Sequence, residues 1–272
     1  MKILIRYGEI ALKSTPVRRR MESLLTRNLR QALSQQGIQA SVKRSFGRIF
    51  LETTEPKKAT ALLKKIFGIV SFSPCSQCPA DIDSIKTLAL TLAKAHSFKT
   101  FAVKARRVGS HKFKSQDVNK AIGATICTLK KKVNLSSPDL TLWIEVRDKT
   151  SYLYTEKIPG QCGFPLGSHG KVPALLETQQ DLLAAWLMMR RGCEIIPVTK
   201  KESFLKILEE WAFHPLPQEP SLEEALKKHP FGIVSANPAH ASELKARYKV
   251  PVYNPLLGIS KDQEKEILKT LK

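Results

Sequence analysis

The densest group of side chains able to bind an anion is a basic loop at residues 106–115. Gly109 permits a tight backbone there, and the side chains around it offer positive charge and hydrogen-bond donors: Arg106, Arg107, Ser110, His111, Lys112, Phe113, Lys114 and Ser115. Cations and hydroxyls in this density are typical of contacts to phosphate. Phe113 either stacks on a base or anchors the loop in the core, and aromatic burial favours the core.

The elements around this loop predict an α+β domain. A strand over Thr100–Ala105 leads into the loop and carries Lys104, a further candidate for phosphate contact. Apolar spacing predicts a helix before the strand, at Asp81–Ala95, and another after the loop, at Gln116–Lys131. Two more strands, Thr141–Arg147 and Ser151–Glu156, form a hairpin around residues 148–150.

The preceding segment predicts a ferredoxin-like unit, because its elements follow the order strand, helix, strand, strand, helix, strand. Ser14 is expected to cap the first helix with its hydroxyl, with Pro16 at a first helical position and Gly37 at the end. Arg18 and Arg19 fall largely off the apolar face of that helix and are candidate RNA contacts. The expected elements after the first strand (2–7) and this helix are strands at 39–44 and 48–52, a helix at 57–66 and a strand at 69–73.

The last hundred residues alternate helices and strands, a pattern that favours a parallel sheet. A glycine-rich connector, Pro159 to Lys171, precedes them. The expected helices are Asp181–Arg191, Glu202–Ala212, Leu222–Lys228, Ala241–Tyr248 and Lys261–Leu271. The expected strands between them are Glu194–Val198, Gly232–Ser235 and Val250–Tyr253.

Charge is distributed unevenly along the 272 residues. The chain has 45 Lys and Arg against 24 Asp and Glu, a net charge of +21. From Lys171 onward there are 15 basic and 13 acidic residues, so residues 1–170 hold 30 basic and 11 acidic residues, a net +19. A fold does not need such an excess, whereas a polyanion would be attracted by it. Nucleic acid is the favoured partner over a membrane surface or simple solvation, since the charges lie on patterned globular segments.

Five cysteines, an odd number in a long chain, argue against a secreted disulfide framework and for the reducing cytoplasm. No apolar run is long enough to cross a bilayer, so no membrane span is expected. Cys75 and Cys78 have the spacing of half a zinc site or a redox pair, but no second Cys or His pair is near. The favoured interpretation is that Cys75 and Cys78 are two thiols at a domain boundary or form a local disulfide.

Several motifs together resemble the THUMP domain and its neighbours in the tRNA 4-thiouridine synthetase (tRNA sulfurtransferase) family. The basic loop reads Arg106-Arg107-x-Gly-Ser-His-x-Phe-x-Ser, and other matching pieces begin at Arg6, Phe46, Lys65 and Gly163. The match is nearly continuous over residues 1–172 and returns at Ala184–Val198. The resemblance implies three domains: ferredoxin-like (1–79), THUMP with the connector (80–172) and a reduced α/β ATPase-like domain of the PP-loop type (173–272).

In that family the first two domains hold the acceptor stem and 3′ end of tRNA. The third domain binds ATP, adenylates uridine 8 and inserts sulfur relayed through a cysteine persulfide. The resemblance therefore implies that this chain binds tRNA. It also implies a homodimer, because family members act across subunits.

The chain departs from the family where ATP would bind. The family's Ser-Gly-Gly-x-Asp-Ser loop exposes backbone N–H groups to phosphate at a helix N-terminus. In its place stand Leu176, Glu177, Thr178, Gln179, Gln180 and Asp181. The two acids are expected to complement the helix N-terminus themselves, which would leave the anion site self-occupied. The domain is shorter than in the family, and no cysteine follows Cys193 to serve as the sulfur relay.

Two functions follow from these observations. The first is a tRNA-binding protein without ATP-dependent catalysis, which uses no cofactor or metal and has a modifying enzyme as a possible partner. The second is an active sulfurtransferase in 4-thiouridine biosynthesis, with a rebuilt or partner-supplied ATP site. A third, weaker interpretation gives the last domain an unrelated small ligand.

Overall fold

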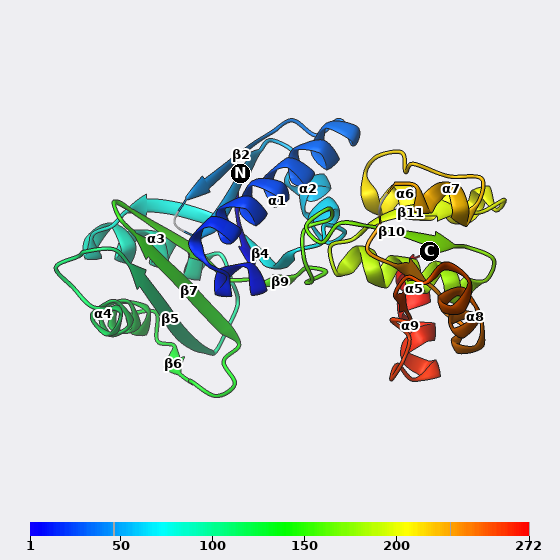
Figure 1. The fold of residues 1–272 in the computed structure, drawn as a ribbon. Helices are drawn as coiled ribbons and strands as arrows, with labels where there is room; N and C mark the ends of the chain where they lie inside the picture. The colour runs from blue at the N-terminus through cyan, green and yellow to red at the C-terminus, as the bar shows by residue number, and fades with distance from the viewer. Residues whose placement is uncertain (46, 229, 272) are drawn as a thin grey trace. The chain divides into compact units, whose positions relative to one another are not determined.

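The computed structural model describes residues 1–45, 47–228 and 230–271 (Figure 1). Phe46, part of one motif quoted above, lies outside the described residues. The chain forms two compact units. The first comprises residues 1–6, 40–56 and 71–159, and the second comprises residues 7–39, 57–70 and 160–272. Within the described part of the chain, no helix is both long and apolar enough to span a membrane.

One mixed sheet runs through the first unit. Within the described residues its strand order is β2-β3-β1-β4-β8-β7-β5-β6, and β9 pairs with β4 beside this path. The strands are β1 (Lys2–Tyr7), β2 (Ala40–Ser45), β3 (Arg48–Thr53), β4 (Ile69–Pro79), β5 (Thr100–Val108), β6 (Lys132–Val133), β7 (Leu140–Arg147), β8 (Thr150–Tyr154) and β9 (Ile158–Pro159). The ferredoxin-like and THUMP strands therefore share a single sheet.

Strand β4 joins the two halves of this sheet. Its early residues pair with β9, Ser71 opposite Pro159, and its last four residues pair with β8, Ser76 opposite Leu153. The sequence predicted this strand over residues 69–73. The prediction of the end was wrong, since pairing on both sides of Pro74 keeps the backbone extended to Pro79.

Helices α3 (Ile82–Lys94) and α4 (Ser115–Cys127) pack on one face of β5, β7 and β8 (Figure 1). Alternate residues of β7 supply the core beneath them: Leu140, Leu142, Ile144 and Val146. Asp81 caps α3 by accepting the Ser84 N–H at 2.8 Å. Because side chains alternate across a strand, the other residues of β7 lie on the opposite face: Thr141, Trp143, Glu145 and Arg147.

Two boundaries near the basic loop differ from the prediction. Strand β5 continues to Val108 by pairing in parallel with β7, so Arg106 and Arg107 are strand residues and the loop itself is only residues 109–114. Helix α4 ends at Cys127, four residues early, because Lys130 adopts a positive φ of 60° and β6 then pairs with β5. Both differences come from long-range strand pairing that local spacing does not encode.

The second unit contains α1 (Thr15–Gln35), α2 (Pro56–Leu63) and a parallel α/β domain. Ser14 occupies the N-cap position of α1, but its side chain makes no capping hydrogen bond, so the predicted hydroxyl cap was wrong. Pro16 stands in the first turn as expected, and Gly37 follows the helix with a φ of +63°. A short 3₁₀ helix, Glu9–Leu12, precedes α1.

The α/β domain has a parallel sheet of order β11-β10-β12-β13, as its alternating sequence predicted. Its strands are β10 (Lys171–Leu175), β11 (Glu194–Val198), β12 (Ile233–Val234) and β13 (Val252–Tyr253). Its helices are α5 (Gln179–Arg190), α6 (Glu202–Ala212), α7 (Leu222–Leu226), α8 (Pro238–Tyr248) and α9 (Lys261–Leu271). Residues 182–189 of α5 are all buried, so this helix is the centre of the domain's core.

Candidate nucleic-acid interface

The face of the first unit's sheet opposite α3 and α4 concentrates positive charge. We call it the basic sheet face and define it by the residues that line a pocket of about 340 Å³, of which Ala105 and Ile144 pack in the core under α3 and α4. They come from five strands and the segment after β8: Arg6, Arg48, Lys104, Ala105, Arg106, Trp143, Ile144, Glu145, Tyr154 and Lys157. Five cations and one carboxylate give this lining a net charge of +4.

Strand register brings these side chains together. Lys104 on β5 is the partner of Trp143 on β7, and Arg106 is the partner of Glu145. Trp143 is in turn opposite Tyr154 on β8, and their rings are nearly parallel, with centroids 6.4 Å apart. The face therefore alternates cations with aromatic rings, the combination that single-stranded nucleic acids bind.

Cations crowd the ring of Trp143. The Nζ atoms of Lys157 and Lys104 lie 3.2 Å and 5.1 Å from its centroid. Burial, together with the charges of Arg6, Lys104 and Arg106, holds the pKa of Lys157 below its usual range. An anion at this face would relieve that mutual repulsion.

Glu145 is the acid at the centre of the face. Its side chain is 5% exposed, and it accepts hydrogen bonds from Arg6, Arg48 and Arg147. Burial alone would raise the pKa of this carboxyl, but the charges of Arg48, Arg147 and Arg6 outweigh burial and lower the pKa to about 2. Glu145 is thus ionised at neutral pH and remains outnumbered by its cationic neighbours.

The predicted site residues on β5 separate into two groups. Lys104 and Arg106 are exposed and line the pocket. Arg107, one residue on, points to the other side of the strand, where its Nη1 donates to the Gly109 carbonyl at 2.7 Å. The two arginines, adjacent in sequence, therefore lie on opposite sides of β5.

The loop over residues 109–114 is held by its own contacts. His111 Nε2 donates to the Asp148 carbonyl at 2.6 Å, and a Cβ at Gly109 would lie 2.8 Å from Asp148 Oδ1. Phe113 is half-buried and packs against the core under α3 and α4. Its ring centroid lies 5.5 Å from that of His111. The core alternative for Phe113 therefore fits the structure.

The remaining loop residues make fewer contacts. Ser110, Lys112 and Lys114 are exposed. Lys114 precedes α4, and its backbone N–H donates to Asp117 Oδ2 at 2.7 Å. These three side chains remain predicted contacts, and they lie apart from the lining of the pocket.

The arginines of α1 belong to the second unit. Arg18 lies 3.9 Å from Glu22 in an ion pair, and Arg19 is exposed. A pocket of about 600 Å³ beside α1 is lined instead by Arg20 and Arg27, together with the connector residues Gly167, Ser168 and Gly170. Helix α1 therefore contributes two arginines to this pocket, but they are not Arg18 and Arg19, the two predicted from the sequence.

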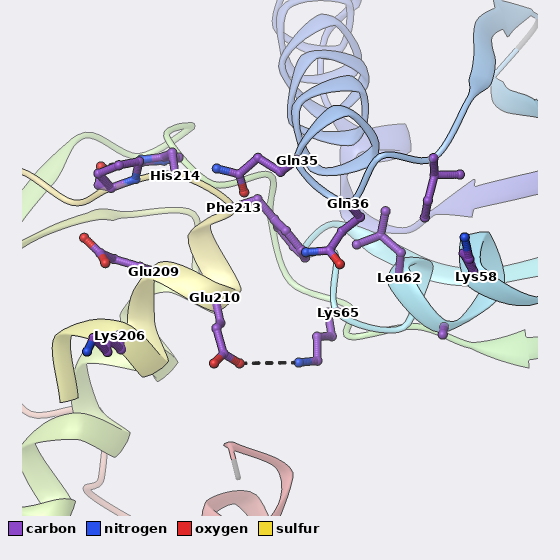
Figure 2. A pocket seen from close by; sticks show the side chains of 13 residues that line it. Gln35, Gln36, Lys58, Leu62, Lys65, Lys206, Glu209, Glu210, Phe213 and His214 are labelled. Atoms are coloured by element: carbon purple, nitrogen blue, oxygen red, sulfur yellow. Dashed lines mark hydrogen bonds and ion pairs between the residues drawn. The ribbon is translucent and has the colours of Figure 1, made fainter. Parts of the chain in front are cut away.

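Another groove of the second unit, about 840 Å³, lies beside the end of α1, α2 and α6 (Figure 2). Its walls carry both signs of charge, and Lys65 reaches to 3.8 Å from Glu210 across it. Glu209 is already engaged, because its Oε1 accepts the Leu216 N–H at 2.9 Å. This groove does not accumulate charge of one sign.

The loop at residues 176–181 closes on itself at the N-terminus of α5. Asp181 Oδ2 accepts from the Thr178 N–H at 2.9 Å, the Thr178 hydroxyl at 2.7 Å and the Glu177 N–H at 3.3 Å. Thr178 Oγ1 accepts the Asp181 N–H in return at 3.2 Å, which completes a capping box. Asp181, and not the exposed Glu177, therefore accepts the hydrogen bonds of this loop.

The rest of this loop is also tied to its surroundings. Leu176 is buried, and its carbonyl accepts from the Thr199 hydroxyl at 2.8 Å. The Lys201 ammonium donates to the Glu177 carbonyl. Gln179 and Gln180 are exposed in the first turn of α5.

The cysteine pair on β4 cannot form a local disulfide. Positions i and i+3 of a strand point to opposite faces, and their Cα atoms are about 10 Å apart, beyond the reach of an S–S bond. Cys75 lies among the residues of the basic sheet face, whereas Cys78 packs under α3. Burial raises the pKa of Cys75 to about 12 and that of Cys78 to about 11, so both remain thiols.

Comparisons with known proteins agree with this architecture. Residues 2–73 match the model of the ThiI ferredoxin-like domain, and residues 79–156 match that of the THUMP domain. A probable tRNA sulfurtransferase of Methanosarcina mazei is 39% identical over 206 residues, which cover 72% of this chain and 51% of the relative. One from Methanocaldococcus jannaschii is 40% identical over 217 residues, covering 75% and 56%. The chain therefore spans about half the length of these relatives.

Two solved structures match nearly the whole chain. PH1313 from Pyrococcus horikoshii is 29% identical with a TM-score of 0.87, and the match covers 99% of each chain. A 4-thiouridine synthetase in complex with RNA and bound ATP has a TM-score of 0.78 over 99% of this chain and 84% of its own, at 23% identity. The second match supports the fold alone.

Most of the basic sheet face was not predicted from the sequence. Arg6 and Arg48 appeared only within family motifs, and Trp143, Glu145, Tyr154 and Lys157 were not singled out. One signal was available: residues 143, 145 and 147 are an aromatic, an acid and a base that alternate with apolar residues, which puts all three on one face of the strand.

Proposed function

Because this chain belongs to the tRNA sulfurtransferase family of THUMP-domain proteins, we propose that it binds tRNA through the basic sheet face. The proposed target is the acceptor stem and 3′ end. The observation that carries the proposal is the surplus of cations around Trp143, where lysine and arginine side chains from several strands converge on one pocket. Single-stranded ends suit such a surface, because an unpaired base can stack while its phosphates contact the cations.

The test is the tRNA affinity of the wild type and of two single variants, Arg106→Gln and Arg107→Gln, measured over a range of salt concentrations. Arg106→Gln is expected to weaken binding about tenfold and to reduce the slope of log K against log salt by about 1, as loss of one phosphate contact does. Arg107→Gln is a matched control with the same charge change on the other side of β5. Equal effects of the two variants, or wild-type binding that ignores salt, would refute the proposed interface.

The proposal includes the absence of ATP-dependent catalysis. Its support is the capping box at α5, because Asp181 takes the backbone donors that an ATP phosphate would contact. A carboxylate there also repels phosphate by roughly 1–4 kcal/mol at partial exposure.

The alternative, an active sulfurtransferase, is tested by titration with ATP and Mg²⁺ in a calorimeter. No binding at millimolar ATP is expected of the wild type. Magnesium-dependent binding that disappears in Glu177→Ala/Asp181→Ala would refute the proposed loss of the ATP site, since the site would then have to include this loop. The control is Glu202→Ala, which removes an exposed acid from the first turn of α6.

A cytoplasmic homodimer is part of the same proposal, with a modifying enzyme as a possible partner. Sedimentation equilibrium measures the oligomeric state directly. A monomer at micromolar concentration, with tRNA binding intact, would remove the dimer from the proposal and leave the interface unaffected.

A further inference from the structure

One carboxylate organises three guanidiniums on the basic sheet face. Glu145 Oε2 accepts from Arg48 Nε at 3.1 Å and from Arg147 Nε and Nη2 at 3.0 and 2.9 Å. Its Oε1 accepts from Arg6 Nε at 3.2 Å, and from the Tyr154 hydroxyl at the same distance. Each oxygen is thus shared between donors from different strands.

The three arginine side chains are packed closely together and largely buried. They come from β1, β3 and β7, and their side chains are 11%, 14% and 6% exposed. Like charges this close repel one another, so they stay together because the carboxylate lies between them. Removing the acid would let the guanidiniums separate.

In the part of the chain that the structure describes, the array also leaves one donor of Arg6 unpaired. Arg6 places its guanidinium carbon 4.6 Å from the Tyr154 ring centroid and donates from Nη1 to Ser73 Oγ at 3.1 Å. Its Nη2 is buried and has no hydrogen-bond partner among the described residues. A buried donor of this kind is costly unless an acceptor reaches it.

We propose that Glu145 is a positioning residue for RNA binding: it orients Arg6 and Arg48 toward the pocket that they line with Lys104, Arg106 and Lys157. The inference rests on the proposed function. Glu145 does not contact RNA in this arrangement. It fixes the guanidiniums in one geometry and leaves a surplus of positive charge for phosphate.

This role predicts that neutralising Glu145 changes RNA affinity in the direction opposite to that expected from net charge alone. A carboxylate beside a phosphate site repels the ligand, so neutralising it ought to tighten binding and steepen the salt dependence. If Glu145 positions the arginines, its neutralisation weakens binding, although the protein becomes more positive. The two explanations therefore differ in direction and not only in size.

The experiment measures tRNA affinity against salt for Glu145→Gln and Glu145→Asp. The first removes the charge at nearly constant volume, and the second keeps the charge but withdraws it by one methylene. Asp83→Asn, on α3 with a side chain 90% exposed, is the charge-matched control for Glu145→Gln. Thermal melts select the temperature at which every variant is folded, and Glu145→Asp serves if Glu145→Gln does not fold.

Both Glu145 variants are expected to bind about tenfold more weakly, the effect of losing a hydrogen bond to a charged group. The slopes of log K against log salt should be shallower by about 1 for both. Asp83→Asn should bind within about twofold of wild type, because Asp83 is exposed on α3 and salt screens its charge from the opposite face of the sheet. In an Arg6→Gln/Arg48→Gln background, Glu145→Asp should have little further effect, since the residues through which it acts are gone.

Tighter binding by Glu145→Gln, or unchanged affinity and slope in folded Glu145→Asp, would overturn the positioning role. Failure of the proposed function has a different signature. In that case the wild type itself shows no salt-dependent tRNA binding, and the Glu145 variants cannot differ from it.

Discussion

The basic sheet face and the N-terminus of α5 both bring positive groups together around one carboxylate, but they reach opposite outcomes. At α5, Asp181 accepts from the N–H groups of Glu177 and Thr178, and Thr178 accepts the Asp181 N–H in return. On the sheet, Glu145 meets three guanidiniums, with further cations lining the same pocket. The ratio of acid to positive groups therefore differs between the two sites, and the proposed function predicts that only the sheet face binds an external anion.

The first way to break this comparison is to remove the central acid of the sheet face. Glu145→Gln is expected to reduce the free energy of unfolding by about 3 kcal/mol at pH 7, because a buried ion cluster loses its only acid. The folded pKa of about 2 lies below the ordinary 4.5, so this stabilisation is present above pH 4.5 and is lost as the pH falls toward 2.

Denaturant unfolding across that pH range measures the effect. The stability of the wild type should fall between pH 5 and pH 2 more steeply than that of Glu145→Gln, and the two should converge at the acid end. Parallel curves would mean that Glu145 is not the titrating group.

The second way is to remove the surplus cations while the central cluster stays. Lys104→Gln/Arg106→Gln should weaken tRNA binding about a hundredfold and lower the salt slope by about 2, with little change in stability. Lys86→Gln/Lys94→Gln, on α3, is the control with the same change in net charge. Similar losses from both pairs would mean that total charge, and not this face, binds RNA.

The third and smallest effect concerns α5. Asp181→Ala should destabilise the protein by about 1 kcal/mol through loss of the capping box. It should also free the backbone donors, so sulfate should stabilise this variant more than the wild type in thermal melts. Glu177→Ala is the control, because its side chain is exposed outside the box, and its stability is expected within about 0.5 kcal/mol of wild type. An equal sulfate response in both variants would contradict self-occupancy by Asp181.

The sequence predicted the elements that have strong local signals. Strand β11 and helices α6 and α9 have the predicted bounds, since apolar periodicity and a continuous buried run mark them. A carboxylate of the chain at the N-terminus of α5 was also predictable, because a capping box depends on two residues three positions apart, here Thr178 and Asp181. Its details were not: Asp181 completes the box, and Glu177 stays outside it.

Elements that depend on distant pairing were missed or cut short. Strands β6 and β9 have two residues each and exist only because β5 and β4 lie beside them. The extension of β5 to Val108 moved Arg106 and Arg107 from a loop into a strand, which placed them on opposite sides. Local spacing could not separate the two arginines, because that separation follows from the register with β7.

The sequence by itself determined the family resemblance and the concentration of the charge excess in residues 1–170, because motifs and charge counts depend only on the order of residues along the chain. Only the tertiary structure decided which cations act together. Arg6, Arg48 and Arg147 are tens of residues apart in the chain and meet at Glu145 because β1, β3 and β7 belong to one sheet. Strand register determines which side chains share this face. Register depends on pairing between segments far apart in the sequence, so local patterns do not reveal it.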